Sequence, residues 1–544
     1  MDLPRPRSRH CPWPAVALLA LLGARALTPL APGTEPDRVA LHDFFANPSF
    51  RHATWGVAVH DADSGISLFE TNSHRLLKPA SNAKLFTGAL ALQVLGPNSR
   101  LATRLIPTGP VSPTGVLDGD LIVQGGGDFS FSPRFHSGNP TASLARIVDT
   151  LRDTGLRQIE GDLVADDSVF VGPPFGNGWT WDDLRYYYGA EVSALSVDDN
   201  ILAFECAPGA APGTPPSFSA GPGASYFEFQ TRGLATVEAS QPRSVVVRRD
   251  PGSRVVHLSG SLPAGAAPSK HEVTVPEPAL FFVHRLREEL AAVGIKVKGT
   301  VRHDRQTLSS NAGPSSDPAH TTLRRRSSRK RAPALPVAPP ISVLSPPVSS
   351  LVGAMMKPSQ NLYAQLLLLQ VGARSSASSS LPSSNPPSPD LTTEDAGVAA
   401  LRRFVREAGI PVDEVQLDDG SGLSRSSLVT PAATVALLRF MDRHPAREAF
   451  LDALPIAGRD GTLRRRFVGT PLEGNLRAKT GSLRHVHALS GFLTNTAGKR
   501  LVFSALLNAY APPESTPPPS PPSGRDALDT LVLRLAQSPP PDPP

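Results

Sequence analysis

Apolar residues recur at helical spacing over residues 85–95, directly after the segment Pro79-Ala-Ser-Asn-Ala-Lys84. This spacing is typical of a helix, and it predicts a buried helix that begins near Ser81. Ser81 and Lys84 share one face of its first turn because they are three residues apart. Burial or a nearby cation favours the neutral form of a lysine, and a neutral amine can take the proton of a serine hydroxyl. The pattern therefore predicts a serine nucleophile with a lysine base.

Alternation of apolar and polar residues predicts β-strands in other parts of the chain. Residues 55–61 and 65–70 alternate on either side of a turn at Asp63-Ser64, which is typical of a hairpin. Between residues 101 and 302 short alternating runs separated by Gly, Pro and Asp predominate, so we expect a β-rich insertion there. Further predicted elements are a helix over 359–371, strands over 475–483, 488–493 and 501–510, and a last helix over 526–535.

Two more short motifs follow the first in order, Ser359-Gln-Asn361 and Lys479-Thr-Gly481. A single Ser-x-x-Lys match carries little information, because Ser327-Ser-Arg-Lys330 also fits it within an arginine-rich run that has few apolar neighbours. The combination of Ser-x-x-Lys, Ser-x-Asn and Lys-Thr-Gly is the motif set of penicillin-binding proteins and class A β-lactamases. The three motifs together favour Ser81 as the nucleophile.

The chain resembles the DacB-type D-alanyl-D-alanine carboxypeptidases/endopeptidases, low-molecular-mass penicillin-binding proteins with a large insertion between the first and second motifs. The resemblance runs from about residue 45 to residue 511. It implies an α+β fold, in which a serine β-lactamase/DD-peptidase-like domain has a five-stranded antiparallel sheet flanked by helices and carries an inserted β-rich region of two lobes. Further segments that resemble the family, in its order, are 119–128, 161–170, 419–424, 454–463 and 478–483.

The resemblance and the composition together predict how the chain is divided. With 544 residues the chain exceeds what one hydrophobic core usually supports. The expected parts are a signal peptide over 1–26, a catalytic domain over 40–102 and 342–536, an inserted domain II over 103–192 and 275–305, an inserted domain III over 193–274, a disordered basic Ser/Pro-rich connector over 306–341 and a disordered tail over 537–544.

The resemblance also implies a role for each catalytic residue. Ser81 would attack the carbonyl carbon of the penultimate D-alanine, and Lys84 would take its proton. Ser359 would pass a proton to the leaving amine with the help of Lys479, whose positive charge would also keep Lys84 neutral. Which lysine is the base stays open.

The residues expected to bind substrate come from the second and third motifs. Asn361 would hydrogen-bond the substrate amide, and Thr480 would hold the terminal carboxylate with Lys479. The backbone N–H groups of Ser81 and Ser482 would form the oxyanion hole. Gly481 would allow the substrate backbone to approach the strand closely.

The composition narrows the other classes of function. The formal charge of +6 equals the contribution of six basic residues between positions 324 and 331, so the basicity is local and no nucleic-acid partner is expected. The simplest interpretation of this basic run is a solvated segment without a specific partner. The alternative is that the run binds anionic envelope polymers or lipids weakly. His485 and His487 are the only suggestion of a metal site, and without a third ligand we expect neither a metal nor a cofactor.

The N-terminus predicts export. Three arginines precede the apolar run 15–23, and Ala24-Arg-Ala26 has the form of a signal-peptide cleavage site. After cleavage we expect no transmembrane anchor and only one thiol, that of Cys206. The protein is therefore expected to be periplasmic or extracellular, in the cell envelope. The sequence does not indicate an oligomeric state.

The expected function is that of a serine DD-peptidase that acts on peptidoglycan stem peptides and is inhibited by penicillin. It would remove a C-terminal D-alanine, cleave D-alanine-linked cross-links, or do both, through an acyl-serine intermediate, with peptidoglycan peptides and β-lactams as ligands. Two alternatives stay open, a β-lactamase and a non-catalytic penicillin-sensing or cell-wall-binding protein. A Ser/His/Asp hydrolase is disfavoured because the chain contains no Gly-x-Ser-x-Gly segment.

Overall fold

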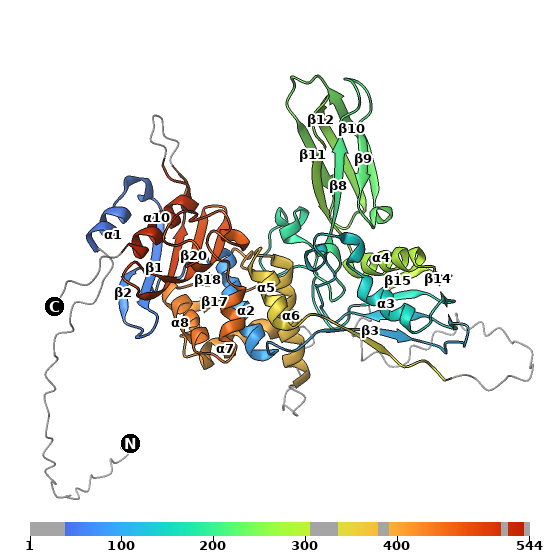
Figure 1. Ribbon diagram of the computed structural model, residues 1–544, viewed down its shortest axis with the longest axis horizontal. Helices are drawn as coiled ribbons and strands as arrows, with labels where there is room; N and C mark the ends of the chain where they lie inside the picture. The colour runs from blue at the N-terminus through green and yellow to red at the C-terminus, as the bar shows by residue number, and fades with distance from the viewer. Residues whose placement is uncertain (1–37, 305–335, 379–390, 513–520, 538–544) are drawn as a thin grey trace, which may run out of the picture.

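The computed structural model describes residues 38–304, 336–378, 391–512 and 521–537 (Figure 1). The predicted signal peptide, most of the predicted connector and the tail after residue 537 lie outside the described residues. No described helix combines the length and the apolar character needed to cross a membrane.

One five-stranded antiparallel sheet organises the catalytic part of the chain, as the resemblance implied. The first described strand pairs with the last one, so segments more than 400 residues apart in the chain meet in this sheet. The predicted hairpin over 55–70 forms its β1–β2 edge. In sheet order the strands are β19 (Arg477–Leu483), β20 (Val486–Thr494), β21 (Arg500–Asn508), β1 (Thr54–Asp61) and β2 (Ser67–Thr71).

Both faces of this sheet are buried. Alternate side chains of a strand point to opposite faces, and each face packs against a different core. In β21, Phe503 and Leu507 pack into a core with α1 (Arg38–Phe45) and α10 (Gly524–Ala536). Val502 and Leu506, on the other face, join the core of a larger helical layer. The helical layer consists of α2 (Ala83–Val94), α5 (Val348–Met356), α6 (Asn361–Ser378), α7 (Thr393–Glu407), α8 (Pro431–Asp442) and α9 (Arg447–Ala453).

The predicted helix after Ser81 is α2, and it lies at the centre of the helical layer. Its residues from Ala83 to Leu92 are all buried. Helix α6 also begins where the sequence predicted, at the second motif, but it continues to Ser378 rather than ending near residue 371. Figure 1 shows α5 and α6 between the five-stranded sheet and the insertion.

The inner part of the insertion contains a second five-stranded sheet, and helices α3 (Ala145–Asp153) and α4 (Pro278–Ala292) pack with it. In sheet order its strands are β15 (Val301–His303), β7 (Leu163–Asp166), β5 (Leu121–Gln124), β3 (Ala102–Pro107) and β16 (Ile341–Leu344). A small parallel sheet adds β14 (Lys296–Val297), β6 (Gln158–Ile159) and β4 (Val116–Leu117).

Strand β16 changes one expected boundary. It follows the predicted connector, but it pairs with β3 of the insertion, with Val343 opposite Thr103. The boundary expected at residue 342 therefore falls inside a strand of the insertion, because backbone pairing to β3 places these residues there. Strands β17 (Val415–Gln416) and β18 (Leu428–Val429) pair with each other near the helical layer. Six other strands form two three-stranded sheets of an outer part, which stands away from the helical layer in Figure 1. They are β8 (Ile201–Ala207), β9 (Ser217–Ala220), β10 (Glu228–Val237), β11 (Ser244–Arg249), β12 (Val255–Pro263) and β13 (Ser269–Thr274).

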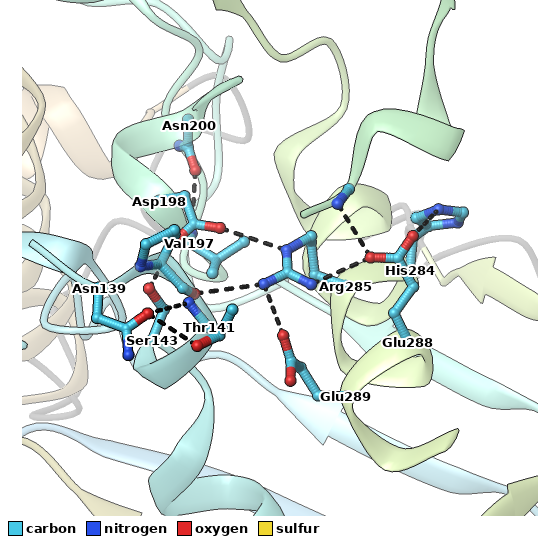
Figure 2. A network of polar contacts seen from close by, with 12 residues as sticks. Asn139, Thr141, Ser143, Val197, Asp198, Asn200, His284, Arg285, Glu288 and Glu289 are labelled. Atoms are coloured by element: carbon cyan, nitrogen blue, oxygen red, sulfur yellow. Dashed lines mark hydrogen bonds and ion pairs between the residues drawn. The ribbon is translucent and has the colours of Figure 1, made fainter. Parts of the chain in front are cut away.

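A buried ion network joins the parts of the insertion (Figure 2). The guanidinium group of Arg285, on α4, is fully buried and contacts Asp198 at 3.3 Å, Glu288 at 3.1 Å and Glu289 at 2.9 Å. Asp198 also accepts a hydrogen bond of 2.5 Å from Ser143. A buried cation needs such partners, since an unpaired charge in the interior is strongly destabilising.

Candidate active site

Ser81 lies in a tight turn directly before α2 rather than in the first turn of the helix. The 3-10 turn Ala80–Asn82 carries it, and Ala80 has a φ of +48°, a left-handed conformation that costs energy for a residue with a Cβ. Asn82 fixes the turn, because its side-chain nitrogen donates a 2.6 Å hydrogen bond to Ser490 on β20. Ser81 lines a cavity of about 1000 Å³.

Lys84 is fully buried and has three hydrogen-bond partners. Its Nζ lies 2.9 Å from Ser81 Oγ, 2.7 Å from Asn361 Oδ1 and 2.8 Å from the backbone oxygen of Ser421. Two of these partners are carbonyl oxygens, which can only accept hydrogen bonds. When Lys84 is a neutral amine, its two N–H groups can satisfy the carbonyls, and its lone pair then faces the hydroxyl of Ser81.

Ser359 and Lys479 form a second serine–lysine pair in the same site. Ser359 lies between α5 and α6 with a φ of +65°, and it lines the cavity together with Ser81. Lys479, on β19, is fully buried and donates a 2.7 Å hydrogen bond to Ser359 Oγ and a 2.8 Å hydrogen bond to the backbone oxygen of Thr480. The structure thus brings together motifs that lie hundreds of residues apart.

Burial changes the protonation of both lysines. It lowers the pKa of Lys84 to about 7, and the Asp419 carboxylate opposes this shift. Burial also lowers the pKa of Lys479 well below its ordinary value, and the nearby charge of Lys84 adds to the shift. The repulsion expected between the two ammonium groups therefore acts at Lys479, while desolvation is the main reason that Lys84 can be neutral near pH 7.

The residues predicted to bind substrate surround the two serines. Asn361, Thr480 and Ser482 line the cavity. Asn361 accepts from Lys84 and donates a 3.0 Å hydrogen bond to the backbone oxygen of Tyr188, in the insertion. The hydroxyl of Thr480 donates a 2.8 Å hydrogen bond to the hydroxyl of Thr462. The cavity wall thus includes side chains and backbone from three separate stretches of the chain.

Gly481 is required at its position by close packing within the protein. A Cβ there would lie 2.7 Å from the backbone oxygen of Pro79, 3.0 Å from the Cβ of Ala488 and 3.1 Å from the backbone nitrogen of Ser81. Strand β19 therefore passes directly beside the turn that carries the nucleophile. This close contact favours glycine at position 481, in addition to the predicted approach of the substrate backbone.

A loop at Asp419 supports the same turn. The Asp419 carboxylate is buried and accepts hydrogen bonds from the backbone N–H groups of Ser421 and Gly422. Gly422, with a φ of +76°, lets this loop approach Ala80, since a Cβ would lie 2.0 Å from the Ala80 backbone oxygen. The loop thereby places the Ser421 carbonyl on Lys84.

Three contributors to this site were missed in the sequence. The first is the hydroxyl of Thr462, which contacts Thr480. The other two are the backbone carbonyl of Tyr188, which contacts Asn361, and the backbone carbonyl of Ser421, which contacts Lys84. Thr462 and Ser421 belong to segments that resemble the family, whereas Tyr188 ends a run of three tyrosines whose position beside Asn361 depends on tertiary packing. His485 and His487 do not share a strand face, because His485 lies in the turn between β19 and β20. Within the described ranges, no group of three or more His, Cys, Asp or Glu side chains is arranged to hold a metal ion.

Comparisons with known proteins show the family of the chain. A model of the D-Ala-D-Ala carboxypeptidase 3 (S13) family matches residues 38–323 and 328–533. The chain is 30% identical over 540 residues to the D-alanyl-D-alanine carboxypeptidase of Actinomadura sp. (strain R39), with 95% of this chain and 88% of that protein covered. It is 28% identical over 446 residues to the D-alanyl-D-alanine carboxypeptidase DacB of Haemophilus influenzae, with 81% of this chain and 82% of that protein covered.

The fold has a solved counterpart. The crystal structure of penicillin-binding protein 4 (dacB) from Haemophilus influenzae matches with a TM-score of 0.70 and 24% identity, over 91% of this chain and 99% of that chain. Its complex with a novel β-lactam matches with a TM-score of 0.64. Since the family model spans most of the chain and the Actinomadura relative covers 95% of it, the chain belongs to the D-Ala-D-Ala carboxypeptidase 3 (S13) family and is a serine-type DD-carboxypeptidase.

Proposed function

We propose that Ser81 is the nucleophile and that Lys84 is the base that activates it. The single observation that carries this assignment is the environment of Lys84. Two carbonyl oxygens occupy its N–H groups, the hydroxyl of Ser81 lies 2.9 Å away, and burial lowers its pKa to about 7. The oxygen of Ser81 attacks the carbonyl carbon of the penultimate D-alanine as its proton moves to Lys84 Nζ.

Ser359 and Lys479 then assist the departure of the leaving group. As the C–N bond breaks, the amine of the leaving residue takes a proton from the Ser359 hydroxyl, and the proton that Lys84 took from Ser81 replaces it, which returns Lys84 to its neutral form. The 2.7 Å hydrogen bond from Lys479 keeps the Ser359 oxygen in place. The acyl group stays on Ser81 until a water molecule attacks the ester, which releases the acid and restores the hydroxyl.

The second and third motifs position the substrate in this proposal. Thr480 and Lys479 hold the terminal carboxylate, and the second N–H of the Asn361 amide binds the substrate backbone. The N–H groups of Ser81 and Ser482 face the developing oxyanion, which is the kind of preorganised contact that contributes most to acyl transfer. The closeness of β19 to the Ser81 turn at Gly481 supports this pairing of donors.

The substrate class in this proposal is the peptidoglycan stem peptide, and β-lactams acylate the same serine. The test is covalent labelling by a fluorescent penicillin followed by digestion of purified peptidoglycan. Labelling is expected to disappear in Ser81→Ala and to persist in Ser327→Ala, which removes the other Ser-x-x-Lys serine. Labelling that survives in Ser81→Ala would contradict the assignment.

The two alternatives predict different kinetics. A β-lactamase would release the acyl group rapidly, so turnover of a chromogenic cephalosporin at tens per second would favour it over the peptidase. A penicillin sensor or wall-binding protein would be labelled but would leave stem peptides uncut. Release of D-alanine or of peptide monomers, sorted by mass, is the outcome expected from the proposed function.

We also propose an exported protein whose chain divides as the sequence predicted, apart from the strand β16. Sequencing the N-terminus of secreted material tests the export. A mature chain that begins shortly after Ala26 is expected, and a chain that still begins at Met1 would contradict cleavage.

A further inference from the structure

Four exposed arginines line the cavity of the candidate active site without an internal counter-charge. Arg464, Arg465, Arg484 and Arg525 all line the cavity that contains Ser81, and all four are exposed. In the described part of the chain, no ion pair and no side-chain hydrogen bond joins any of these guanidinium groups to another residue. We call these four residues the arginine rim.

Two other cations that line the cavity are neutralised, whereas Arg425, which is only partly exposed, has no ion pair within the described residues. Lys357 contacts Asp460 at 2.7 Å, and Arg466 forms a two-pronged ion pair with Asp529. The only acidic side chain among the residues that line the cavity is Asp183. The rim is therefore a net positive surface, and like charges gathered in this way favour the binding of an anion.

The position of the rim relative to the reaction indicates which part of a substrate it meets. Arg464 and Arg465 follow Thr462, whose hydroxyl contacts Thr480, the residue proposed to hold the carboxylate of the leaving residue. Arg484 directly follows β19, which carries Thr480. The rim thus lies beyond the carboxylate site, on the side from which the leaving group departs.

The positive charge near the end of β19 also affects a neighbouring side chain. His487, the second residue of β20, is half-buried, and burial lowers its pKa. The charges of Arg525 and Arg466 lower the pKa of His487 further. Gly524, the first residue of α10, packs against the His487 ring, since a Cβ there would lie 2.1 Å from it, so the start of α10 that carries Arg525 lies beside β20.

A single D-alanine leaving group carries one carboxylate, and the proposed function already assigns that carboxylate to Thr480 and Lys479. Four further guanidinium groups match a leaving group with additional carboxylates, because each guanidinium can bind a carboxylate through two hydrogen bonds. We propose that Arg464, Arg465, Arg484 and Arg525 form a binding site for the carboxylates of a second peptide strand on the leaving-group side. This inference rests on the proposed function, and it makes the charge of the leaving strand a determinant of specificity.

The experiment measures how the protein cleaves two cross-linked peptide substrates. They share the scissile bond and the carboxylate next to it, but in one the other carboxylates of the leaving strand are free and in the other they are amidated. We expect a higher kcat/KM for the acidic peptide, with a ratio that shrinks as salt is added. In the Arg464→Gln/Arg465→Gln variant the ratio should fall about three- to tenfold, mainly through KM, which corresponds to losing two exposed ion pairs.

A second variant and a matched control complete the test. Arg484→Gln/Arg525→Gln should lower the same ratio in the same direction. Arg402→Gln/Arg403→Gln removes two adjacent exposed arginines of α7, which do not line the cavity, and should leave the ratio as in the wild type. A ratio that is unaffected by either rim variant would overturn the inference.

Two further measurements distinguish carboxylate binding from phosphate binding at the rim, and failure of this inference from failure of the proposed function. If a phosphate polymer inhibits the wild type more strongly than the acidic peptide does, and the rim variants abolish that inhibition, the rim binds phosphates and the inference is overturned. Fluorescent penicillin labelling of each variant reports on Ser81 itself. Normal labelling with an unchanged ratio overturns only this inference, whereas loss of labelling in the wild type would overturn the proposed function as well.

Discussion

The side-chain nitrogen of Lys84 lies 2.9 Å from the hydroxyl oxygen of Ser81, and its other two hydrogen-bond partners are carbonyl oxygens. Replacing this amine by an amide, in Lys84→Gln, keeps a donor for the carbonyls but removes the group that takes the proton. Acylation by penicillin should slow by a factor of about 10² to 10⁴, the usual contribution of a positioned base. Stopped-flow labelling measures this rate, and a thermal unfolding midpoint close to that of the wild type is the control. A rate within threefold of the wild type would exclude Lys84 as the base.

The pH dependence of acylation follows from the same lysine. Burial lowers the pKa of Lys84 to about 7, so below this pH the amine holds a proton and cannot accept one from Ser81. The acylation rate should rise about tenfold per pH unit up to about pH 7 and then level off. Because the unfolded chain keeps this proton up to the ordinary value of 10.5, the free energy of unfolding should also increase between about pH 7 and 10.5. A rate that is flat between pH 5 and 9 would contradict the assignment.

Ser359 combines a chemical role with a strained backbone, since its φ is +65°. Glycine adopts this conformation without a Cβ penalty, whereas alanine does not. Ser359→Gly and Ser359→Ala should both lose the hydroxyl that contacts Lys479 and cut peptide turnover about 10²-fold. The glycine variant should be more stable than the alanine variant by about 1 kcal/mol. Equal stabilities in urea denaturation would argue against strain at this position.

Gly481 separates β19 from the nucleophile turn. In Gly481→Ala the new methyl carbon would lie 2.7 Å from the Pro79 backbone oxygen, so one of the two segments must move. We expect a loss of about 1 to 3 kcal/mol in the free energy of unfolding and slower labelling of Ser81. Gly353→Ala is the matched control, because a Cβ there meets nothing within 4 Å and the residue lies in helix α5, where alanine is preferred. Faster labelling in Gly481→Ala than in the control would contradict this packing.

Arg285 should be the most sensitive residue of the insertion (Figure 2). Arg285→Leu would leave the buried carboxylate of Asp198 without its cation, and removing one partner of a buried ion pair costs about 3 to 5 kcal/mol. Arg287→Leu, on the same helix but partly exposed, should cost less than about 1 kcal/mol. Chemical denaturation followed by intrinsic fluorescence compares the two variants. Similar losses in both would show that the network contributes little.

Much of this protein was determined by its sequence alone. The spacing of apolar residues predicted α2 and the β1–β2 hairpin, and the three motifs contain Ser81, Lys84, Ser359, Asn361, Lys479 and Thr480, which the structure brings into one site. These features are local, because helix and strand periods depend on neighbouring residues and a motif keeps its residues at fixed spacing. The family resemblance added the five-stranded sheet, which no local pattern specifies.

Tertiary structure decided the rest. The placement of β16 beside β3, the Tyr188 carbonyl on Asn361 and the contact of Thr462 with Thr480 each join residues that are distant in the chain. The pKa of Lys84 likewise depends on burial, which arises only when the loop at Asp419 closes over α2. Contacts and desolvation of this kind are properties of the packed interior, since they depend on atoms that the chain brings together only by folding.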